Sequence, residues 1–333
     1  MTNSSFSPIP GVWAVSNVTS LVRDRADLCS DGVVPDSYST STASNTTTAA
    51  DVADIAELRR VAVYLAETAA AHVRSRRPEV FGPGTRAADS VQAKSTPTDP
   101  VTVVDTEAEQ LIRKLLDELR PDDRIIGEEG GGALNGDAVH WVLDPIDGTV
   151  NFLYGIPAYA VSVAAMRGGR SLAGAVADVA HGTVYSAGLG QGAHLIQPGV
   201  DPIPLRCNEV DSAAMSLVAT GFAYNRHRRT RQGQLIAELL PHIRDIRRVG
   251  AAALDLCMVA EGRVDAHYEH GLNLWDWAAG ALIAAEAGAR LILPAPESSG
   301  AEGALVVAAA PGVADEMFGL LEELGATDAI PEG

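Results

Sequence analysis

The sequence predicts a layered α/β fold, and three observations support that prediction. Residues 124–196 contain short apolar runs separated by glycine-rich turns, which is typical of strands in an antiparallel or mixed sheet. From about residue 205 onward, strand-like runs alternate with helical patterns, which favours a smaller α/β layer. The chain has 333 residues, of which 47% are hydrophobic, so it is long enough to bury a full core.

We expect three parts along the chain. Residues 1–50 would form a disordered tail, because nine of the twelve residues at 37–48 are Ser or Thr and bury too little apolar surface to offset the entropy of ordering. Residues 51–204 would form an N-terminal α+β part. Residues 205–333 would form a C-terminal α/β part.

Hydrophobic periodicity predicts the elements in order. A first helix begins near Asp51, its expected cap, and a second spans residues 106–119 with Asp105 as its expected N-cap. Strands are expected at residues 124–126, 139–143, 158–166, 172–179, 184–187 and 193–196. In the C-terminal part, strands are expected at residues 216–220, 266–268, 290–293 and 305–309, and helices at 232–240, 254–260, 278–287 and 315–324.

Charge and composition exclude several classes of protein. The formal net charge of −18 disfavours direct binding to nucleic acid or to an anionic membrane surface. The sequence has no run of 18 apolar residues and no basic-then-apolar N-terminus, so neither a membrane span nor a secretory signal is expected. Three scattered cysteines without a C-x-x-C pair favour a reducing compartment, and we expect a cytoplasmic protein.

A pair of carboxylates is the most informative motif. Asp144 and Asp147 follow the apolar run at residues 139–143, and Pro145 and Gly148 predict a turn there. Two acids that point the same way repel each other unless a cation neutralises them. Oxygen ligands on a tight turn suit Mg²⁺. A plain Asp-Gly turn on a loop is the alternative that this segment leaves open.

Three further segments carry acids at the ends of expected elements. Asp105 lies where a loop becomes a helix, which fits either a plain N-cap or a catalytic carboxylate. Glu128 and Glu129 precede three glycines after an expected strand, which fits a solvated loop or a ligand site at a strand end. Asp276 lies between two tryptophans before an Ala-rich helix and fits a cap equally well.

In this order and spacing, these segments resemble the inositol monophosphatase family of magnesium-dependent, lithium-sensitive phosphatases. The matching segments are D-P-V-T-V-V-D at 99–105, G-E-E at 127–129, D-P-I-D-G-T-V-N-F at 144–152 and L-W-D-W-A-A-G at 274–280. The resemblance covers about residues 55–310, and the surroundings look most like bacterial inositol-1-monophosphatases. It implies an α-β-α-β-α sandwich of the type shared with fructose-1,6-bisphosphatases, and a homodimer.

The resemblance also implies two or three Mg²⁺ ions and a set of site residues. The implied metal ligands are Glu128, Glu129, Asp144, the backbone carbonyl of Ile146, Asp147 and Asp276. Thr149 and Asp105 would accept the proton of an attacking water, with Glu128 acting through the metal. The implied contacts to a phosphorylated polyol are Asp147, Gly148, Thr149, Gly250, Ala252, Glu269 and Asp276.

The function implied is hydrolysis of inositol 1-phosphate to inositol and phosphate. Fructose-1,6-bisphosphatases, histidinol-phosphate phosphatases and nucleotide 3′-phosphatases share the fold and the metal motifs, so these activities stay open. A different class also stays open, because some bacterial relatives act as binding partners of the transcription or RNA machinery.

Overall fold

The computed structural model describes residues 49–82, 91–94 and 100–332, which belong to one compact unit. The tail predicted for residues 1–50 lies outside this part, apart from Ala49 and Ala50, which already belong to the first helix. Asp99, in the first of the four matching segments, also lies outside it. No helix in the described ranges is long and apolar enough to cross a bilayer.

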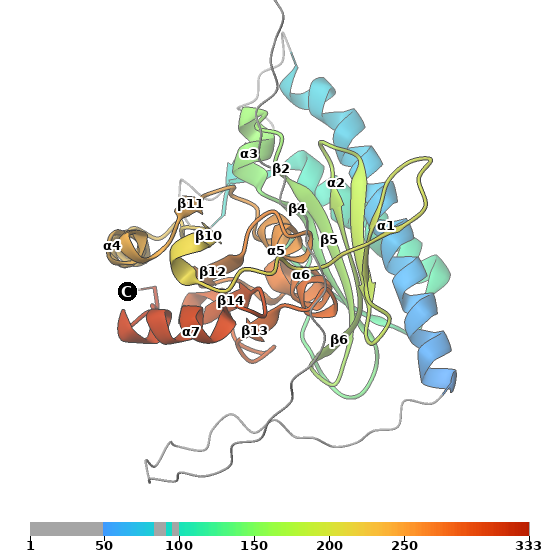
Figure 1. Cartoon of the computed structure of the whole chain (residues 1–333). Helices are drawn as coiled ribbons and strands as arrows, with labels where there is room; N and C mark the ends of the chain where they lie inside the picture. The colour runs from blue at the N-terminus through green and yellow to red at the C-terminus, as the bar shows by residue number, and fades with distance from the viewer. Residues whose placement is uncertain (1–48, 83–90, 95–99, 333) are drawn as a thin grey trace, which may run out of the picture. The chain divides into compact units, whose positions relative to one another are not determined.

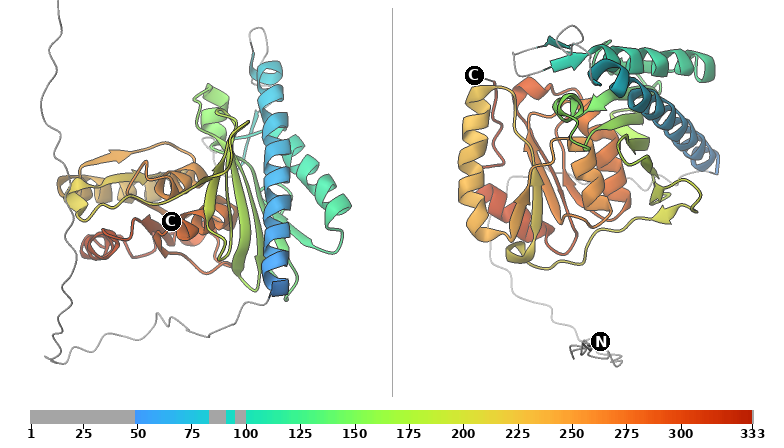
Figure 2. Two further views of the ribbon diagram at one scale, coloured as in Figure 1. Left: turned by 45° about the vertical axis from the view of Figure 1, so that its right-hand side comes forward. Right: turned by 90° about the horizontal axis from the view of Figure 1, so that it is seen from above.

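Helices and sheets in the described residues stack in five layers (Figures 1 and 2). Helices α1 (Ala49–Phe81) and α2 (Val103–Leu119) cover the outer face of a seven-stranded sheet. Helices α5 (Ala252–Ala260) and α6 (Leu274–Glu286) lie between that sheet and a five-stranded sheet. Helices α4 (Arg226–Leu239) and α7 (Ala314–Glu323) cover the outer face of the second sheet. The predicted α-β-α-β-α sandwich is confirmed.

The seven-stranded sheet follows chain order and is antiparallel except where its first two strands pair in parallel. Its strands are β3 (Arg124–Gly127), β4 (His140–Asp147), β5 (Ala160–Arg167), β6 (Arg170–Asp178), β7 (Thr183–Gly188), β8 (Ala193–Ile196) and β9 (Ile203–Pro204). A short helix, α3 (Thr149–Tyr154), follows β4. Strands β1 (Val91–Ala93) and β2 (Pro100–Thr102) form a separate antiparallel pair.

The five-stranded sheet is mixed, with the order β11-β10-β12-β14-β13. Its strands are β10 (Leu217–Thr220), β11 (Asp245–Arg247), β12 (Ala266–His270), β13 (Arg290–Ile292) and β14 (Leu305–Ala309). Short 3-10 turns occur at Ala213–Met215, Leu240–His242 and Gly300–Glu302. The prediction did not include the short strands β1, β2, β9 and β11 or the short helix α3, whose sequences do not stand out from the surrounding loops by period or by apolar content.

Three apolar cores fill the spaces between the layers because alternate strand residues point to opposite faces. On β4, Trp141 and Leu143 pack towards α1 and α2, whereas Val142 packs towards α5 and α6. On β12, Ala266 and Tyr268 pack towards α4 and α7. The intervening residues of each strand are therefore left to face the middle layer.

All the predicted helices begin earlier than predicted, by up to six residues at α4, and two of them also differ in their expected cap. Helix α2 begins three residues earlier than predicted, because the Thr102 hydroxyl accepts from the Val104 amide at 3.2 Å and caps the helix. Asp105 is the third helical residue, and its carboxylate accepts from the Thr102 amide at 3.0 Å. This is a capping box, in which Thr and Asp satisfy each other's backbone amides. Helix α1 begins before Asp51, so Asp51 is not its cap.

Close contact between α5 and α6 leads to a stability prediction. A Cβ on Gly280 would lie 2.8 Å from Leu256 Cβ, whereas a Cβ on Gly319 in α7 would meet nothing within 4 Å. Both Gly→Ala changes gain up to about 1 kcal/mol of helix propensity, and only Gly280→Ala adds an overpacking cost of about 1–3 kcal/mol. We expect Gly280→Ala to melt below Gly319→Ala in thermal unfolding. Equal melting temperatures would contradict this packing.

Candidate active site

The two acids of the central motif lie in a bulged end of β4. Strand β4 pairs with β5 at Asp144–Ser162 and next at Asp147–Ala160, so β4 has one extra residue. Without that residue, acids three positions apart would point to opposite faces; with it, both share the face of Ser162 and Ala160. The turn predicted at Pro145 is therefore wrong, because β4 continues to Asp147.

Pro145 is tolerated in this strand because β3 pairs with β4 only as far as Leu143. A proline cannot donate to a sheet ladder and is accommodated at edges and bulges. The chain turns one step later, at Gly148, whose φ of 91° is left-handed and favours glycine. Gly148 also ends the strand directly before α3.

Asp147 connects the end of β4 to the start of α5. Its carboxylate accepts from the amides of Ala252 at 3.2 Å and Ala253 at 2.7 Å, at the start of α5. Helix α5 has no side-chain cap of its own, so Asp147 satisfies amides that would otherwise lack partners. A carboxylate at a helix N-terminus is also favoured by the helix dipole.

Thr149 and Asp105 are in contact, although 44 residues separate them. The Thr149 hydroxyl lies 3.1 Å from Asp105 Oδ1 and 3.0 Å from the Ile146 carbonyl oxygen, within hydrogen-bonding distance of both. Asp105 is fully buried behind Thr149. Burial, reinforced by the negative charge of Glu128, raises the pKa of Asp105 to about 7, although hydrogen bonds from Thr102 oppose the shift.

Glu128 follows β3 and is held beside β4 by its own amide, which donates to the Leu143 carbonyl at 3.1 Å. The loop after it is anchored by Glu109, whose carboxylate accepts from the amides of Glu129 and Gly130, both at 2.8 Å. Sequence reasoning missed Glu109. The available signal was an acid four residues after Asp105, on the buried face of α2.

Lys94 neutralises part of this acidic loop. Its ammonium lies 2.7 Å from Glu128 Oε1 and 2.5 Å from Glu129 Oε1. Despite partial burial, these two carboxylates raise the pKa of Lys94 and keep the ammonium charged. Any third ion beside Glu128 and Glu129 would therefore compete with Lys94.

Asp276 lies in the first turn of α6. It is the third helical residue, and Asn273 is the cap, so the predicted capping role of Asp276 is only half of a capping box. Its Oδ2 accepts from the Asn273 amide at 2.7 Å. The three short residues that follow, from Ala278 to Gly280, are buried where α6 packs on α5 and the large sheet.

These segments surround a cavity of about 410 Å³. The predicted site residues that line it are Glu128, Asp144, Ile146, Asp147, Gly148, Thr149, Gly250, Ala252, Glu269 and Asp276. Asp105 and Glu129 do not line it; Asp105 lies behind Thr149 and Glu129 points to Lys94. Arg248 and Arg228 also line the cavity. Sequence reasoning missed Arg248, whereas Arg228 belongs to a basic cluster for which the sequence favoured a solvated face over phosphate attraction; Arg228 is in fact buried.

The charged forms of the aspartates around the cavity are destabilised. Burial first, and then the charge of Glu128, raises the pKa of Asp144 and of Asp276 well above its usual range. Burial raises the pKa of Asp147 to about 7 even though backbone amides of α5 oppose the shift. Within the described residues, none of these three aspartates forms an ion pair with a basic side chain. The donor set, several carboxylates and a carbonyl, fits a hard divalent cation such as Mg²⁺.

Glu269 lies on the opposite wall of the cavity. Burial raises its pKa to about 7, Arg248 lowers it, and Asp147 raises it further. Gly250 and Ala252 flank the start of α5 beside Asp147. The structure thus brings residues of the seven-stranded sheet, of helices α5 and α6 and of strand β12 to one cavity.

Comparisons with known proteins show the family of this chain. Residues 54–325 match the model of the inositol monophosphatase family. The chain belongs to the inositol monophosphatase family. The inositol-1-monophosphatase SuhB of Mycobacterium tuberculosis is 58% identical over 285 residues, which cover 83% of this chain and 97% of the relative. A solved structure of Mycobacterium tuberculosis SuhB matches with a TM-score of 0.70 and 54% identity, covering 82% and 98% of the two chains.

A second group of relatives carries a different name. The Nus factor SuhB of Pasteurella multocida is 38% identical over 213 residues, covering 63% of this chain and 78% of that protein.

Membership of the inositol monophosphatase family makes this chain a phosphatase of the inositol monophosphatase fold.

The raised pKa values predict an unusual pH dependence of stability. Asp105, Asp147 and Glu269 titrate near 7 when folded, whereas unfolded Asp and Glu titrate near pH 4. Between these values the folded chain holds more protons than the unfolded chain, so its stability falls as the pH rises. With divalent cations chelated, we expect the melting temperature to fall from pH 5 to pH 8. Glu269→Gln should make that fall shallower, and a rise over this range would contradict the assignment.

Proposed function

We propose that this protein is a Mg²⁺-dependent phosphomonoesterase that hydrolyses inositol 1-phosphate to inositol and phosphate. The observation that carries the proposal is the cavity where Asp144, Asp147 and Asp276, which have no ion-pair partner among the described residues, lie beside the Thr149–Asp105 pair. Buried carboxylates without basic partners require protons or metal ions to be stable. The 58% identity to the inositol-1-monophosphatase of Mycobacterium tuberculosis supports the substrate class.

Two Mg²⁺ ions fit the donors around the cavity. Glu128, Asp144 and the Ile146 carbonyl would hold the first ion, and Asp144, Asp147 and Asp276 the second. When bound, Mg²⁺ supplies a lower pKa for water and neutralises the charge that develops on the phosphate and leaving oxygens. A third ion beside Glu128 and Glu129 is less favourable in this chain, because the Lys94 ammonium contacts both carboxylates.

The residues of the chain position the attacking water and take its proton. Thr149 Oγ1 accepts a hydrogen bond from the water and donates one to Asp105 Oδ1, so Asp105 orients the hydroxyl and favours loss of the water proton. The water attacks phosphorus in line as the P–O bond to the polyol breaks, and the leaving oxygen gains a proton. The backbone amides of Gly148 and Thr149 at the left-handed turn bind phosphate oxygens.

The opposite wall selects the polyol. Glu269 accepts hydrogen bonds from ring hydroxyls, Gly250 and Ala252 border the ring, and Asp147 and Asp276 lie near further hydroxyls. Arg248 at the rim adds positive charge that favours an anionic substrate.

Phosphate release from a substrate panel tests this function. The panel contains inositol 1-phosphate, fructose 1,6-bisphosphate, histidinol phosphate and a nucleotide 3′-phosphate, each with Mg²⁺ or with chelator. We expect preference for inositol 1-phosphate and no turnover in chelator. Preference for another ester would overturn the substrate and keep the mechanism, and full turnover in chelator would overturn the metal assignment.

Thr149→Ala tests the proton-accepting pair. We expect kcat to fall about 10²–10⁴-fold, the usual contribution of a positioned acid–base group. The Mg²⁺ concentration for half-maximal activity should change little, because the hydroxyl is not a metal ligand. Thr149→Ser, which keeps the hydroxyl, is the matched control. Lost Mg²⁺ affinity with unchanged kcat at saturating Mg²⁺ would contradict the assignment.

Glu269→Gln tests the polyol contact. We expect the KM for inositol 1-phosphate to rise about 10-fold, in keeping with a lost charge-assisted hydrogen bond of about 1.5 kcal/mol. The KM for an aryl phosphate, which lacks ring hydroxyls, should stay nearly constant. Equal changes for both esters would remove Glu269 from the substrate contact.

A second function is favoured by one observation, the 38% identity to a relative named as a Nus factor. In that case the protein would bind a partner of the transcription machinery through a surface outside the cavity. A stoichiometric partner that binds Asp144→Asn as well as the wild-type chain would support this function. The net charge of −18 favours a protein partner over direct binding to RNA. The homodimer, cytoplasmic location and lithium sensitivity stay predictions.

A further inference from the structure

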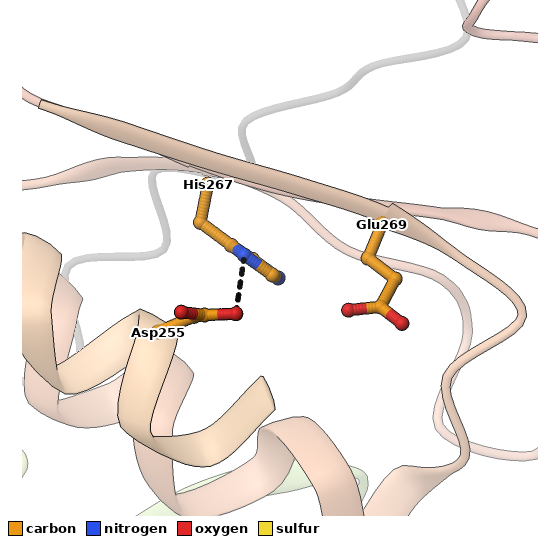
Figure 3. Close-up of side chains that lie close together, drawn as sticks. All are labelled: Asp255, His267 and Glu269. Atoms are coloured by element: carbon orange, nitrogen blue, oxygen red, sulfur yellow. Dashed lines mark ion pairs between the residues drawn. The ribbon is translucent and has the colours of Figure 1, made fainter. Parts of the chain in front are cut away.

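A second cluster of metal-ligating side chains lies between helix α5 and strand β12, next to the cavity wall that carries Glu269. Asp255 lies in the first turn of α5, and His267 and Glu269 are two residues apart on β12, so they share one face of that strand. One ligand atom from each lies within 4.8 Å of the others. Figure 3 shows the three side chains pointing into the same space between α5 and β12.

Two members of this cluster are buried, and among the described residues they have no hydrogen-bond partner, although they approach each other at ion-pair distance (Figure 3). Asp255 is 1% exposed and His267 is 0% exposed. Within the described residues, neither carboxylate oxygen of Asp255 and neither ring nitrogen of His267 has a hydrogen-bond partner. Their nearest approach, His267 Nδ1 to Asp255 Oδ2, is 3.8 Å, which is too long for a hydrogen bond.

Buried polar groups in proteins are almost always satisfied, so four orphaned atoms in one place require an explanation. Fully buried carboxylates and imidazoles are normally paired or bound to a metal. Glu269 points into the same space (Figure 3), but it forms no hydrogen bond with either ring nitrogen of His267. The geometry therefore calls for a small species that accepts lone pairs from all three side chains.

We propose that Asp255, His267 and Glu269 bind one divalent transition-metal ion, with Zn²⁺ as the best fit, at a site separate from the aspartates of β4 and α6. Imidazole nitrogen is a poor ligand for Mg²⁺ and a good one for Zn²⁺, which accepts mixed nitrogen and carboxylate ligands. Three protein ligands leave a fourth position open. The proposed site adjoins the cavity, because Glu269 also lines it.

The cluster differs from the catalytic set in chemistry as well as place. The catalytic set is built from carboxylates and one carbonyl, and only the second cluster contains an imidazole. Because Glu269 also belongs to the cavity wall, a zinc ion bound to its carboxylate would change the contact between Glu269 and the polyol. This effect on the polyol rests on the proposed function, whereas binding of the zinc ion does not.

Zinc binding to the full chain tests the site. Equilibrium dialysis against Zn²⁺ is carried out in excess Mg²⁺, which occupies the all-oxygen set, and bound zinc is measured by elemental analysis. We expect one zinc per chain. Asp255→Asn and His267→Gln, which keep side-chain volume, should each weaken zinc binding by at least about 10–100-fold, the loss caused even by removing outer-sphere partners.

Two control variants separate this site from others. His181→Gln removes an exposed histidine elsewhere and should keep the zinc. Asp144→Asn disrupts the catalytic set and should also keep it. Zinc lost in Asp144→Asn but kept in Asp255→Asn and His267→Gln would assign the ion to the catalytic set and overturn the proposal. No zinc above the Mg²⁺ background would leave water as the occupant and overturn it too.

A spectroscopic measurement needs no variant. The zinc X-ray absorption spectrum of the wild-type chain in excess Mg²⁺ should show one imidazole nitrogen among oxygen ligands. A shell without imidazole would overturn the proposal even if the variants at Asp255 and His267 fail to fold. Inositol phosphatase activity is not needed for any of these readouts, so failure of the proposed function is distinguishable from failure of the zinc site.

Discussion

Asp147 accepts hydrogen bonds from the first amides of α5, and much of the molecule depends on this contact. Asp147 is the last residue of β4, and α5 lies between the two sheets. The contact therefore fixes the cavity wall that carries Glu269 relative to the wall that carries Asp144. It also satisfies a helix end that has no cap of its own. The carboxylate of Asp147 thus caps α5, positions the two cavity walls relative to each other and belongs to the proposed metal site.

The same cavity concentrates negative charge that the fold does not neutralise. Asp144 and Asp147 are buried, Asp276 is partly buried, and all three have raised pKa values. Among the described residues, the basic partner of the site is Lys94, which contacts Glu128. Burial of like charges lowers stability and raises affinity for cations, since bound ions offset both the desolvation and the repulsion. The stability and the chemistry of this protein are therefore coupled through the occupancy of one site.

Glu269 connects the two clusters of acids. It lines the cavity, and it shares the space between α5 and β12 with Asp255 and His267. Helix α5 carries Asp255 and also binds Asp147 at its first turn. A change in the position of this helix would move both clusters together. The middle layer of the sandwich is thus the physical link between the catalytic acids and the buried imidazole.

The sequence by itself predicted the layered α/β fold and most of the strands and helices, because these depend on local period and on residue type. The acids of the four motifs were assigned to one site by their resemblance to the inositol monophosphatase family. Asp105 and Asp276 show the limit of the sequence. The sequence pattern allows either to be an N-cap, but Thr102 and Asn273 cap the helices, since two good capping residues three apart are indistinguishable without the backbone. Only the tertiary structure showed the bulge that turns Asp144 and Asp147 to one face, because a bulge is defined by the partner strand. Long-range contacts likewise decided the roles of Glu109, Asp255 and His267, whose partners lie on other elements and leave no pattern in the neighbouring sequence.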